Sequence, residues 1–297
     1  MIFINYYDEI KNELVNNEIT KKVKDYSKNR SDLTTYYNVG KLLSKAGKHY
    51  GEGIIKEYSK RLTNEFGTKF GITLLKRIRQ FYIVIEKGAT MSHQLSWSHY
   101  CELLPVNSID KINYYIKITK EQNLSIRELR TKIKNNEYER LDESTKEKLK
   151  EKEELKVPDL VKNPIQIKNT SGNNEISEKI LQKLILEDIP FFLKELGNGF
   201  CFINNEYKIK IGDRYNYIDL LLYNYEFNCF VVVELKITEL KKEHIGQIEF
   251  YMNYIDKNLK SINQNKTIGI IICKKENRYV IEYCSDDRII SREYELV

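Results

Sequence analysis

Apolar residues in the first 140 positions recur every three or four residues, which is the spacing of amphipathic helices. Three such segments end at a glycine, as helix C-termini often do. A fourth opens with Ser125 and Glu128 at the spacing of a capping box. The segments are residues 32–47, 53–67, 72–88 and 124–138. Short helices separated by glycine-containing turns predict a compact all-helical domain over residues 1–140, with a helix-turn-helix element as an open alternative.

The pattern changes in the second half of the chain. Residues 175–197 have helical spacing, with a break at Pro190 and an end at Gly197. Strand-like runs rich in β-branched and aromatic residues follow, and an amphipathic helix lies between the third and the fourth. The runs are residues 200–211, 217–225, 229–237, 267–274 and 279–284, and the helix is residues 239–256. This order predicts an α/β (α+β) domain with a central mixed sheet over residues 173–297.

Residues 141–172 separate these two parts. Their hydrophobicity is low, their charges alternate, and they contain Pro158 and Pro164. We expect a charged helical extension followed by a linker.

Composition narrows the class of protein. The chain is 41% hydrophobic and 31% charged, as in soluble globular proteins. No run approaches the ~18 to 20 consecutive apolar residues of a membrane span, and the first residues do not resemble a signal peptide. The five cysteines are odd in number and contain no CxxC pair, and the four histidines do not cluster. We therefore expect a cytoplasmic protein without a membrane partner, a zinc site or a disulfide framework.

Charge divides unevenly along the chain. Residues 1–140 contain 25 Lys and Arg against 16 Asp and Glu, a net of +9, whereas residues 141–297 contain 24 against 27, a net of −3. A basic first part is typical of polyanion binding, and ordinary solvated helix faces explain it equally well. In the predicted helix 72–88, Lys76, Arg77 and Arg79 are the candidate nucleic-acid-binding residues, with Thr73 and Gln80 beside them.

A possible catalytic constellation lies on two neighbouring hydrophobic runs. Glu234 and Lys236 are two residues apart in a predicted strand and therefore share one face. Asp219 interrupts the apolar run before it. If the two strands are adjacent, the carboxylates of Asp219 and Glu234 converge, and a cation such as Mg²⁺ would relieve their repulsion. Lys236 could then orient or deprotonate a water molecule, as metal-assisted phosphodiester hydrolysis requires.

A simpler interpretation of the same residues stays open. An ExK pair on a strand is often a surface ion pair, and an aspartate near a strand start is often a turn residue. We find no GxGxxG, GxxxxGK[ST], HExxH or GxSxG motif that would compete as a site.

Asp219, followed after fourteen residues by Glu234-Leu235-Lys236, resembles the PD-(D/E)xK nuclease signature, with Ile218 in place of the proline that often precedes the aspartate. The chain is further similar to the YhcG-like PDDEXK nuclease family over nearly its whole length, excepting the linker and about the first twenty residues. The segments that carry the similarity are residues 36–43, 58–67, 74–82, 95–100, 124–133, 192–203, 217–256 and 267–284.

The resemblance implies a restriction-endonuclease-like α/β domain and assigns roles to site residues. Asp219 and Glu234 would bind Mg²⁺ or Mn²⁺ together with the backbone carbonyl near Leu235, and Lys236 would be the catalytic lysine. Gln247, on the following helix, would position water or phosphate. We expect it to lie on a different helix face from the buried Leu240, Ile248 and Tyr251.

The first helix of the nuclease fold usually contributes an acidic residue. Glu178 is the chosen candidate, with Glu175 and Glu187 as alternatives. The resemblance also supports nucleic-acid binding by the helical domain, through Lys76, Arg77 and Arg79, whereas Trp97 is expected to pack in the core.

These observations lead to a Mg²⁺-dependent nuclease that acts on DNA in preference to RNA. By kinship, we also expect a role against foreign DNA, a homodimer, and a restriction or defence-system protein as partner. The alternative function is a nucleic-acid-binding or recruitment protein whose nuclease site is silent or gated by a partner.

Overall fold

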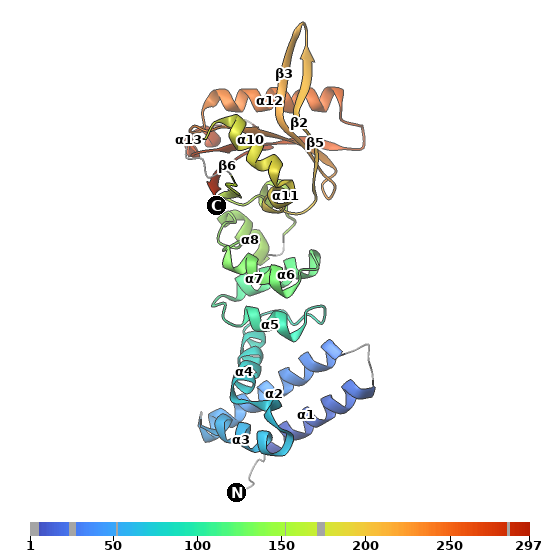
Figure 1. Ribbon diagram of the computed structural model, residues 1–297, viewed down its shortest axis with the longest axis vertical. Coiled ribbons are helices and arrows are strands. Elements are labelled where there is room, and N and C mark those ends of the chain that lie inside the picture. The colour runs from blue at the N-terminus through green and yellow to red at the C-terminus, as the bar shows by residue number, and fades with distance from the viewer. Residues whose placement is uncertain (1–5, 24–27, 52, 152, 171–175, 284–285) are drawn as a thin grey trace. The chain divides into compact units, whose positions relative to one another are not determined.

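The computed structural model describes residues 6–23, 28–51, 53–151, 153–170, 176–283 and 286–297. It divides into two compact units, residues 1–138 and 139–297 (Figure 1). None of the described helices is long and apolar enough to cross a membrane.

Unit 1 is helical, as its apolar spacing predicts. Its elements are α1 (Tyr6–Val23), α2 (Lys28–Tyr50), α3 (Ile54–Phe66), a 3₁₀ turn (Thr68–Phe70), α4 (Ile72–Glu86), α5 (Trp97–Leu103), α6 (Ile109–Glu121) and α7 (Ile126–Lys134). The capping box of α7 is present: the backbone N–H and the hydroxyl of Ser125 both donate to the Glu128 carboxylate, and Ser125 Oγ accepts from the Glu128 N–H.

The helices α1 to α4 enclose one apolar core. Its buried members include Ile10, Leu43, Leu62, Leu75 and Ile78. The helix predicted to end at Gly47 continues to Tyr50. The glycine that follows the helix end is Gly51 instead of Gly47. Gly51, at φ +82°, has the left-handed conformation that a helix end favours.

Trp97 packs against the core of unit 1, as predicted. Its ring lies 4.6 Å from that of Tyr36 and 5.6 Å from that of Phe81, measured between centroids. It joins the unit 1 core as a partly buried member.

Unit 2 contains the mixed sheet. Its elements are α8 (Glu143–Glu151), α9 (Val157–Leu160), β1 (Ile165–Ile167), α10 (Glu178–Glu187), α11 (Ile189–Leu196), β2 (Phe200–Ile211), β3 (Arg214–Asn224), β4 (Cys229–Leu235), α12 (Lys242–Asn258), β5 (Asn265–Cys273), α13 (Arg278–Glu282) and β6 (Ile289–Leu296). The strand order is β1-β6-β5-β4-β3-β2. The pairs β2–β3 and β3–β4 are antiparallel, and β4–β5, β5–β6 and β1–β6 are parallel.

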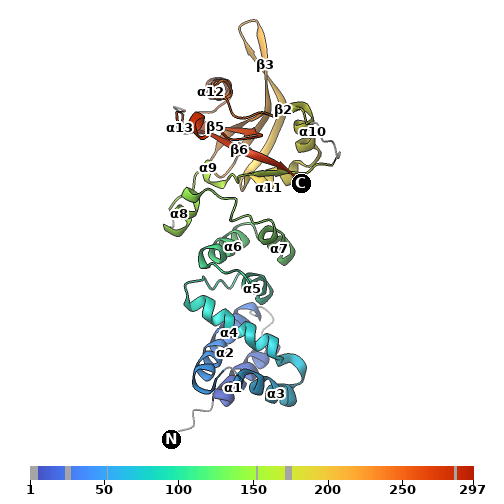
Figure 2. The ribbon, with the colours of Figure 1, turned by 90° about the vertical axis from the view of Figure 1, so that its left-hand side faces the viewer.

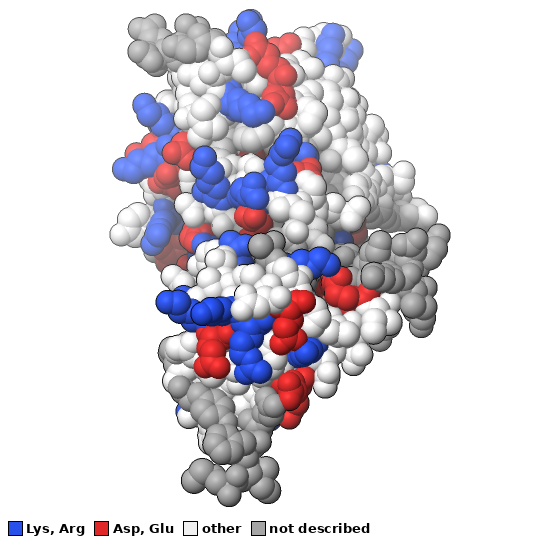
Figure 3. All heavy atoms as spheres, turned by 60° about the horizontal axis from the view of Figure 1, so that its bottom comes forward, with Lys and Arg blue, Asp and Glu red and all other residues white. Residues whose placement is uncertain are grey.

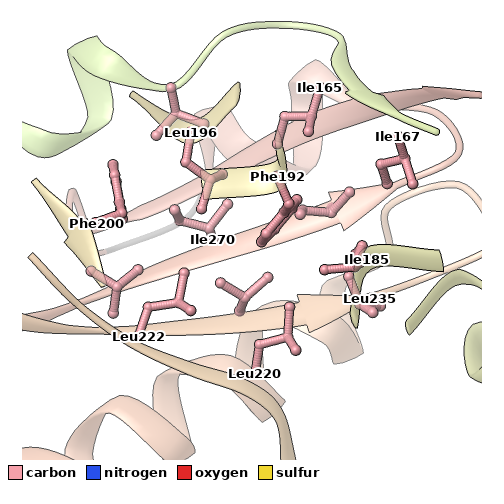
Figure 4. Close-up of a cluster of buried hydrophobic side chains, with 14 of the residues drawn as sticks. Ile165, Ile167, Ile185, Phe192, Leu196, Phe200, Leu220, Leu222, Leu235 and Ile270 are labelled. Carbon is pink, nitrogen blue, oxygen red and sulfur yellow. The ribbon is translucent and has the colours of Figure 1, made fainter. Parts of the chain in front are cut away.

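Helices cover both faces of this sheet (Figures 1 and 2). On one face, α10 and α11 pack against alternate residues of β3, β4 and β5 (Figure 4). On the other, α12 packs through Ile248, Met252 and Ile255. Gly269 of β5 allows this contact, because a Cβ there would lie 2.6 Å from the sulfur of Met252.

Three sequence expectations for unit 2 are wrong. Residues 279–284 were predicted as a strand, but Asn277 caps a short helix, α13, by accepting from the Val280 N–H. The strand β6 was not predicted, since its apolar residues stand among charged ones. Within the range predicted as a charged extension and linker, Glu143–Glu151 forms the charged helix α8, but the expected linker also contains β1, which extends the sheet beside β6.

A close approach of α2 and α4 gives the first prediction. Gly40→Ala should destabilise unit 1 by about 1–3 kcal/mol, because the new Cβ would lie 2.5 Å from the Ile78 carbonyl oxygen and 2.6 Å from the Tyr82 Cβ. Urea unfolding followed by far-ultraviolet circular dichroism measures it. Gly53→Ala is the control, since a Cβ there meets nothing within 4 Å. An equal loss from both substitutions would contradict this packing.

A buried ion pair in unit 2 gives the second prediction. Arg140 Nη1 lies 2.5 Å from Glu195 Oε2, and both side chains are buried. Glu195 Oε2 also accepts from the Gln166 N–H, and Lys162 Nζ lies 3.8 Å from Oε1. Glu195→Ala should cost about 3–5 kcal/mol, because it leaves buried cations without their carboxylate.

The same pair sets a pH dependence. Burial alone would raise the pKa of Glu195, but Arg140 and Lys162 outweigh it and hold that pKa below its usual range. The pair's contribution is therefore complete above the carboxyl group's unfolded pKa, near 4.3, and is lost as the pH falls through the lowered folded value. Acid unfolding of the wild type should be steeper than that of Glu195→Gln. Glu143, which is exposed and pairs with the half-buried Lys146, is the control, and Glu143→Ala should leave the unfolding midpoint unchanged.

Candidate active site

The sheet opens at the place where Asp219 and Glu234 meet. Pairing of β3 with β4 ends at Leu220 opposite Val233, while β3 continues to pair with β2. One step beyond this last pair, Asp219 Oδ2 accepts a hydrogen bond of 2.8 Å from the Leu235 N–H. The Asp219 carboxylate thus accepts the Leu235 N–H, which a backbone carbonyl of β3 would accept if the two strands stayed paired. The predicted adjacency of the two strands and of their carboxylates is present.

Glu234 and Lys236 lie side by side inside the domain. Lys236 Nζ is 3.3 Å from Glu234 Oε2. Lys236 is 9% exposed and Glu234 is 1% exposed. The second carboxylate oxygen, Oε1, is buried and has no hydrogen-bond partner among the described residues. A buried carboxylate oxygen without a partner is costly. It therefore marks a position where a donor or a cation would be stabilising.

The electrostatics of the site point the same way. Burial, followed by the neighbouring Asp219 carboxylate, raises the pKa of Glu234 to about 8. Burial also raises the pKa of Asp219, against the lowering effect of the Leu235 N–H. Two buried carboxylates hold their protons unless positive charge compensates them.

Lys236 is the cation already present. Burial alone would lower its pKa, but the carboxylates of Glu234, Glu178 and Asp219 raise it above the ordinary lysine value. Lys236 is therefore held as an ammonium group, which donates a hydrogen bond to Glu234.

Helix α10 contributes a third carboxylate. Glu178 Oε2 lies 3.8 Å from Lys236 Nζ. Glu187, at the other end of α10, accepts from Thr170 Oγ1 and lies 3.9 Å from Lys183. Glu175 lies outside the described residues. Of the two acidic candidates that the structure describes, only Glu178 reaches Lys236.

Gln182, one turn after Glu178 on α10, was not among the site residues predicted from the sequence. It is 8% exposed, and its Nε2 donates to the Asp219 carbonyl oxygen at 3.0 Å. The signal that could have found it is the spacing Glu178–Gln182, because residues four apart share one helix face. Together these two residues connect α10 to the ends of β3 and β4.

Gln247 lies on α12 and is half-buried. Its Nε2 donates to the hydroxyl of Tyr251 at 3.2 Å. The expectation that Gln247 lies on a different helix face from the buried residues is wrong for Tyr251, because a separation of four places these two residues together. Burial raises the pKa of Tyr251, and the Glu234 and Asp219 carboxylates add to that rise. Tyr251 is therefore an electrostatic neighbour of the site that periodicity assigned to the core alone.

Glu206 is a further acidic neighbour with no sequence signal. The pairs Tyr207–Ile218 and Asn205–Leu220 on either side place it opposite Asp219. Its backbone has φ +47°, which is uncommon for glutamate. Its carboxylate adds to the rise in the pKa of Asp219.

The donor set fits a small, hard divalent cation. Within the described ranges, no three His, Cys, Asp or Glu side chains form a group that could hold a metal. Asp219 and Glu234 supply two carboxylates. Leu235 supplies a backbone carbonyl on the β4 edge that faces Asp219, since a strand residue directs its N–H and C=O to the same side. Oxygen ligands completed by water are what Mg²⁺ prefers.

The basic residues predicted to bind nucleic acid lie on α4 of unit 1. Lys76 and Arg77 are exposed, whereas Arg79 is half-buried with its guanidinium against Gly47. Gln80, expected to reach outward, donates to the Leu104 carbonyl oxygen at 2.7 Å. On the face shown in Figure 3, basic side chains are interspersed with acidic ones. Binding by Lys76, Arg77 and Arg79 therefore stays a prediction.

Comparisons with known proteins find a family model that matches each unit. The model of the YhcG PDDEXK nuclease domain matches residues 158–296, and that of the DUF1016 N-terminal domain matches residues 9–140. The chain is 24% identical over 330 aligned positions to "Putative nuclease YhcG" of Escherichia coli (strain K12), covering 95% of this chain and 88% of that one.

Solved structures match the chain over a shorter stretch. A repair endonuclease from Pyrococcus abyssi is 19% identical with a TM-score of 0.29, and covers 43% of this chain and 49% of that one. EndoMS in complex with double-stranded DNA is 17% identical with a TM-score of 0.29, and covers 43% and 48%. The chain thus spans about half the length of these structures. With the two models matched in order along the sequence, the chain combines a DUF1016 N-terminal domain over residues 9–140 with a YhcG PDDEXK nuclease domain over residues 158–296.

Proposed function

We propose that unit 2 hydrolyses phosphodiester bonds of DNA with a divalent metal, Mg²⁺ or Mn²⁺, held by Asp219, Glu234 and the Leu235 carbonyl. The observation that carries the proposal is the meeting of Asp219, Glu234 and Lys236 at the opening between β3 and β4. Raised carboxyl pKa values support a cation there, as does Glu234 Oε1, which has no hydrogen-bond partner among the described residues. In the cell, this activity would act against foreign DNA.

In this proposal the residues of the chain divide the work. The metal, when bound, supplies Lewis-acid stabilisation of the phosphoryl oxygens. Lys236 donates to the attacking water or to the phosphate, so its ammonium offsets the negative charge that develops at phosphorus. Glu178 forms an ion pair with Lys236 at 3.8 Å and keeps it oriented. The water oxygen forms a bond to phosphorus, the bond from phosphorus to one sugar oxygen breaks, and that oxygen takes up a proton.

Two further groups would shape the site. Gln182 fixes the backbone of Asp219, so we assign it a positioning role. Gln247, held by Tyr251, is the polar side chain of α12 that could bind a water or a phosphate oxygen. In unit 1, the net charge of +9 over residues 1–140 supports delivery of a polyanion by Lys76, Arg77 and Arg79.

The third prediction tests this function directly. With Mg²⁺ or Mn²⁺, the full chain should cleave plasmid or single-stranded DNA, and Asp219→Asn, Glu234→Gln and Lys236→Met should each lower the rate by at least about 10²-fold. Gel assays with parallel RNA substrates measure the rates. Lys183→Met removes an exposed lysine of α10 and should leave the rate unchanged. The proposal fails if the wild type cleaves neither DNA nor RNA, which would favour a silent or partner-gated binding protein.

The fourth prediction separates the acidic candidates of α10. Glu178→Gln should slow cleavage by about 10–100-fold, as loss of an outer partner of a metal site commonly does. Glu187→Gln should not, because Glu187 contacts Thr170 and Lys183 instead. Both variants are compared in single-turnover cleavage at saturating metal. Equal rates for the two variants would remove Glu178 from the site.

A further inference from the structure

The hairpin of β2 and β3 extends beyond the rest of the sheet (Figure 1). The pairing of β3 with β4 covers only Leu220–Asn224, whereas the pairing of β3 with β2 continues to Ile211 opposite Arg214. Gly212 and Asp213 form the turn, with Gly212 at φ +58°. Residues 207–218 therefore form a two-stranded arm that begins beside Asp219.

The two faces of this arm differ in chemistry. Ile209 and Ile218 are fully buried, and they join the core under α12 with Tyr207 and Ile211. The opposite face carries two directly paired couples, Lys208–Tyr217 and Lys210–Tyr215, and all four residues are exposed. Tyr215 and Tyr217 are 51% and 52% exposed. The inner face explains how the arm is held, and it leaves the outer face without a structural role in the core.

Ammonium groups and aromatic rings alternate closely on the outer face. Lys208 Nζ lies 3.8 Å from the ring centroid of Tyr215, and Lys210 Nζ lies 5.9 Å from it. Residues 207–217 contain three basic side chains and one acidic one. One common role of lysines on an edge strand is to prevent pairing with a strand of another chain. That role does not explain the two exposed tyrosines opposite them.

The outer face leads to the candidate active site. Tyr215 and Tyr217 are alternate residues of β3, so their side chains leave one face about 6.8 Å apart, and Asp219 lies two residues further along the strand. The alternation breaks at Asp219, opposite Glu206 with its positive φ, because Ile218 packs in the core under α12 and Leu220 in the core under α10. A strand of nucleic acid lying along this face would run along β3 toward Asp219. Its bases could stack on the tyrosine rings, and its phosphates could pair with the lysines.

We propose that the outer face of the β2–β3 arm, Lys208, Lys210, Tyr215 and Tyr217, binds unpaired nucleotides of the substrate next to the bond that is cut. This inference rests on the proposed hydrolysis of nucleic acid. It identifies the substrate as one with a single-stranded segment, in which bases are free to stack.

The fifth prediction measures binding apart from cleavage. All variants are made in the full-length Lys236→Met chain with Mg²⁺, and fluorescence anisotropy is recorded with labelled single-stranded DNA, single-stranded RNA of equal sequence, and duplex DNA. Tyr215→Ala and Tyr217→Ala should each weaken single-strand binding about tenfold. Tyr215→Phe and Tyr217→Phe should each keep the single-strand affinity within about twofold of the parent's, because phenylalanine keeps the stacking surface.

The lysines should act through charge. Lys208→Ala together with Lys210→Ala should reduce the slope of log affinity against log salt by about 1.4, or ~0.7 for each phosphate that the arm no longer neutralises. Tyr225→Ala and Lys257→Ala are the matched controls, since both side chains are exposed and lie outside the arm. They should bind as the parent does. Comparison of the DNA and RNA strands tells which backbone the arm takes.

Three results would overturn the inference: unchanged single-strand affinity in both alanine variants, equally weakened binding in the phenylalanine variants, or weakening confined to duplex DNA. A parent dimer that the alanine variants dissociate, seen by analytical ultracentrifugation, would assign the face to self-association instead. Cleavage by the chain with native Lys236 is measured separately. Absence of that cleavage refutes the proposed function and leaves the binding result readable.

Discussion

Two carboxylates, the buried Glu234 and the half-buried Asp219, lie next to each other where β3 and β4 separate, and their repulsion is the constraint on which the candidate site depends. Glu234 is 1% exposed with one oxygen lacking a partner among the described residues, and Asp219 lies beside it on the neighbouring strand. Like charges in a desolvated place raise each other's pKa and cost stability. In the proposed function, a bound divalent cation would compensate this contact.

The surrounding elements hold that contact in place at three points. The Leu235 N–H fixes the Asp219 carboxylate, Gln182 fixes the Asp219 backbone, and Lys236 bridges Glu234 to Glu178. These groups come from α10, from β4 and from the residue that follows β4, so the apolar cores on both faces of the sheet set their positions. The divergence of β3 from β4 has a second effect, because the freed part of β3 forms the arm with β2.

Much of this could be predicted from the sequence, and the failures have physical causes. The strands β2 to β5 and the helix α12 follow from apolar runs and period, and Asp219, Glu234 and Lys236 follow from strand alternation. The strand β6 was missed because Arg292 and Glu293 interrupt its apolar pattern, and only the fold shows that Arg292 is satisfied by the Val161 and Pro158 carbonyls. Gln182, Glu206 and Tyr251 act through contacts between distant segments, which periodicity does not report.

The central claim is that Asp219 and Glu234 are held together for a cation, and the most direct measurement is thermal unfolding with and without Mn²⁺. We expect Mn²⁺ to raise the unfolding midpoint of the wild type and to leave Asp219→Asn and Glu234→Gln unchanged, since a ligand stabilises only the state that binds it. In EDTA, both variants should be at least as stable as the wild type. A wild-type midpoint that Mn²⁺ does not move, or equal increases in all three proteins, would contradict the account.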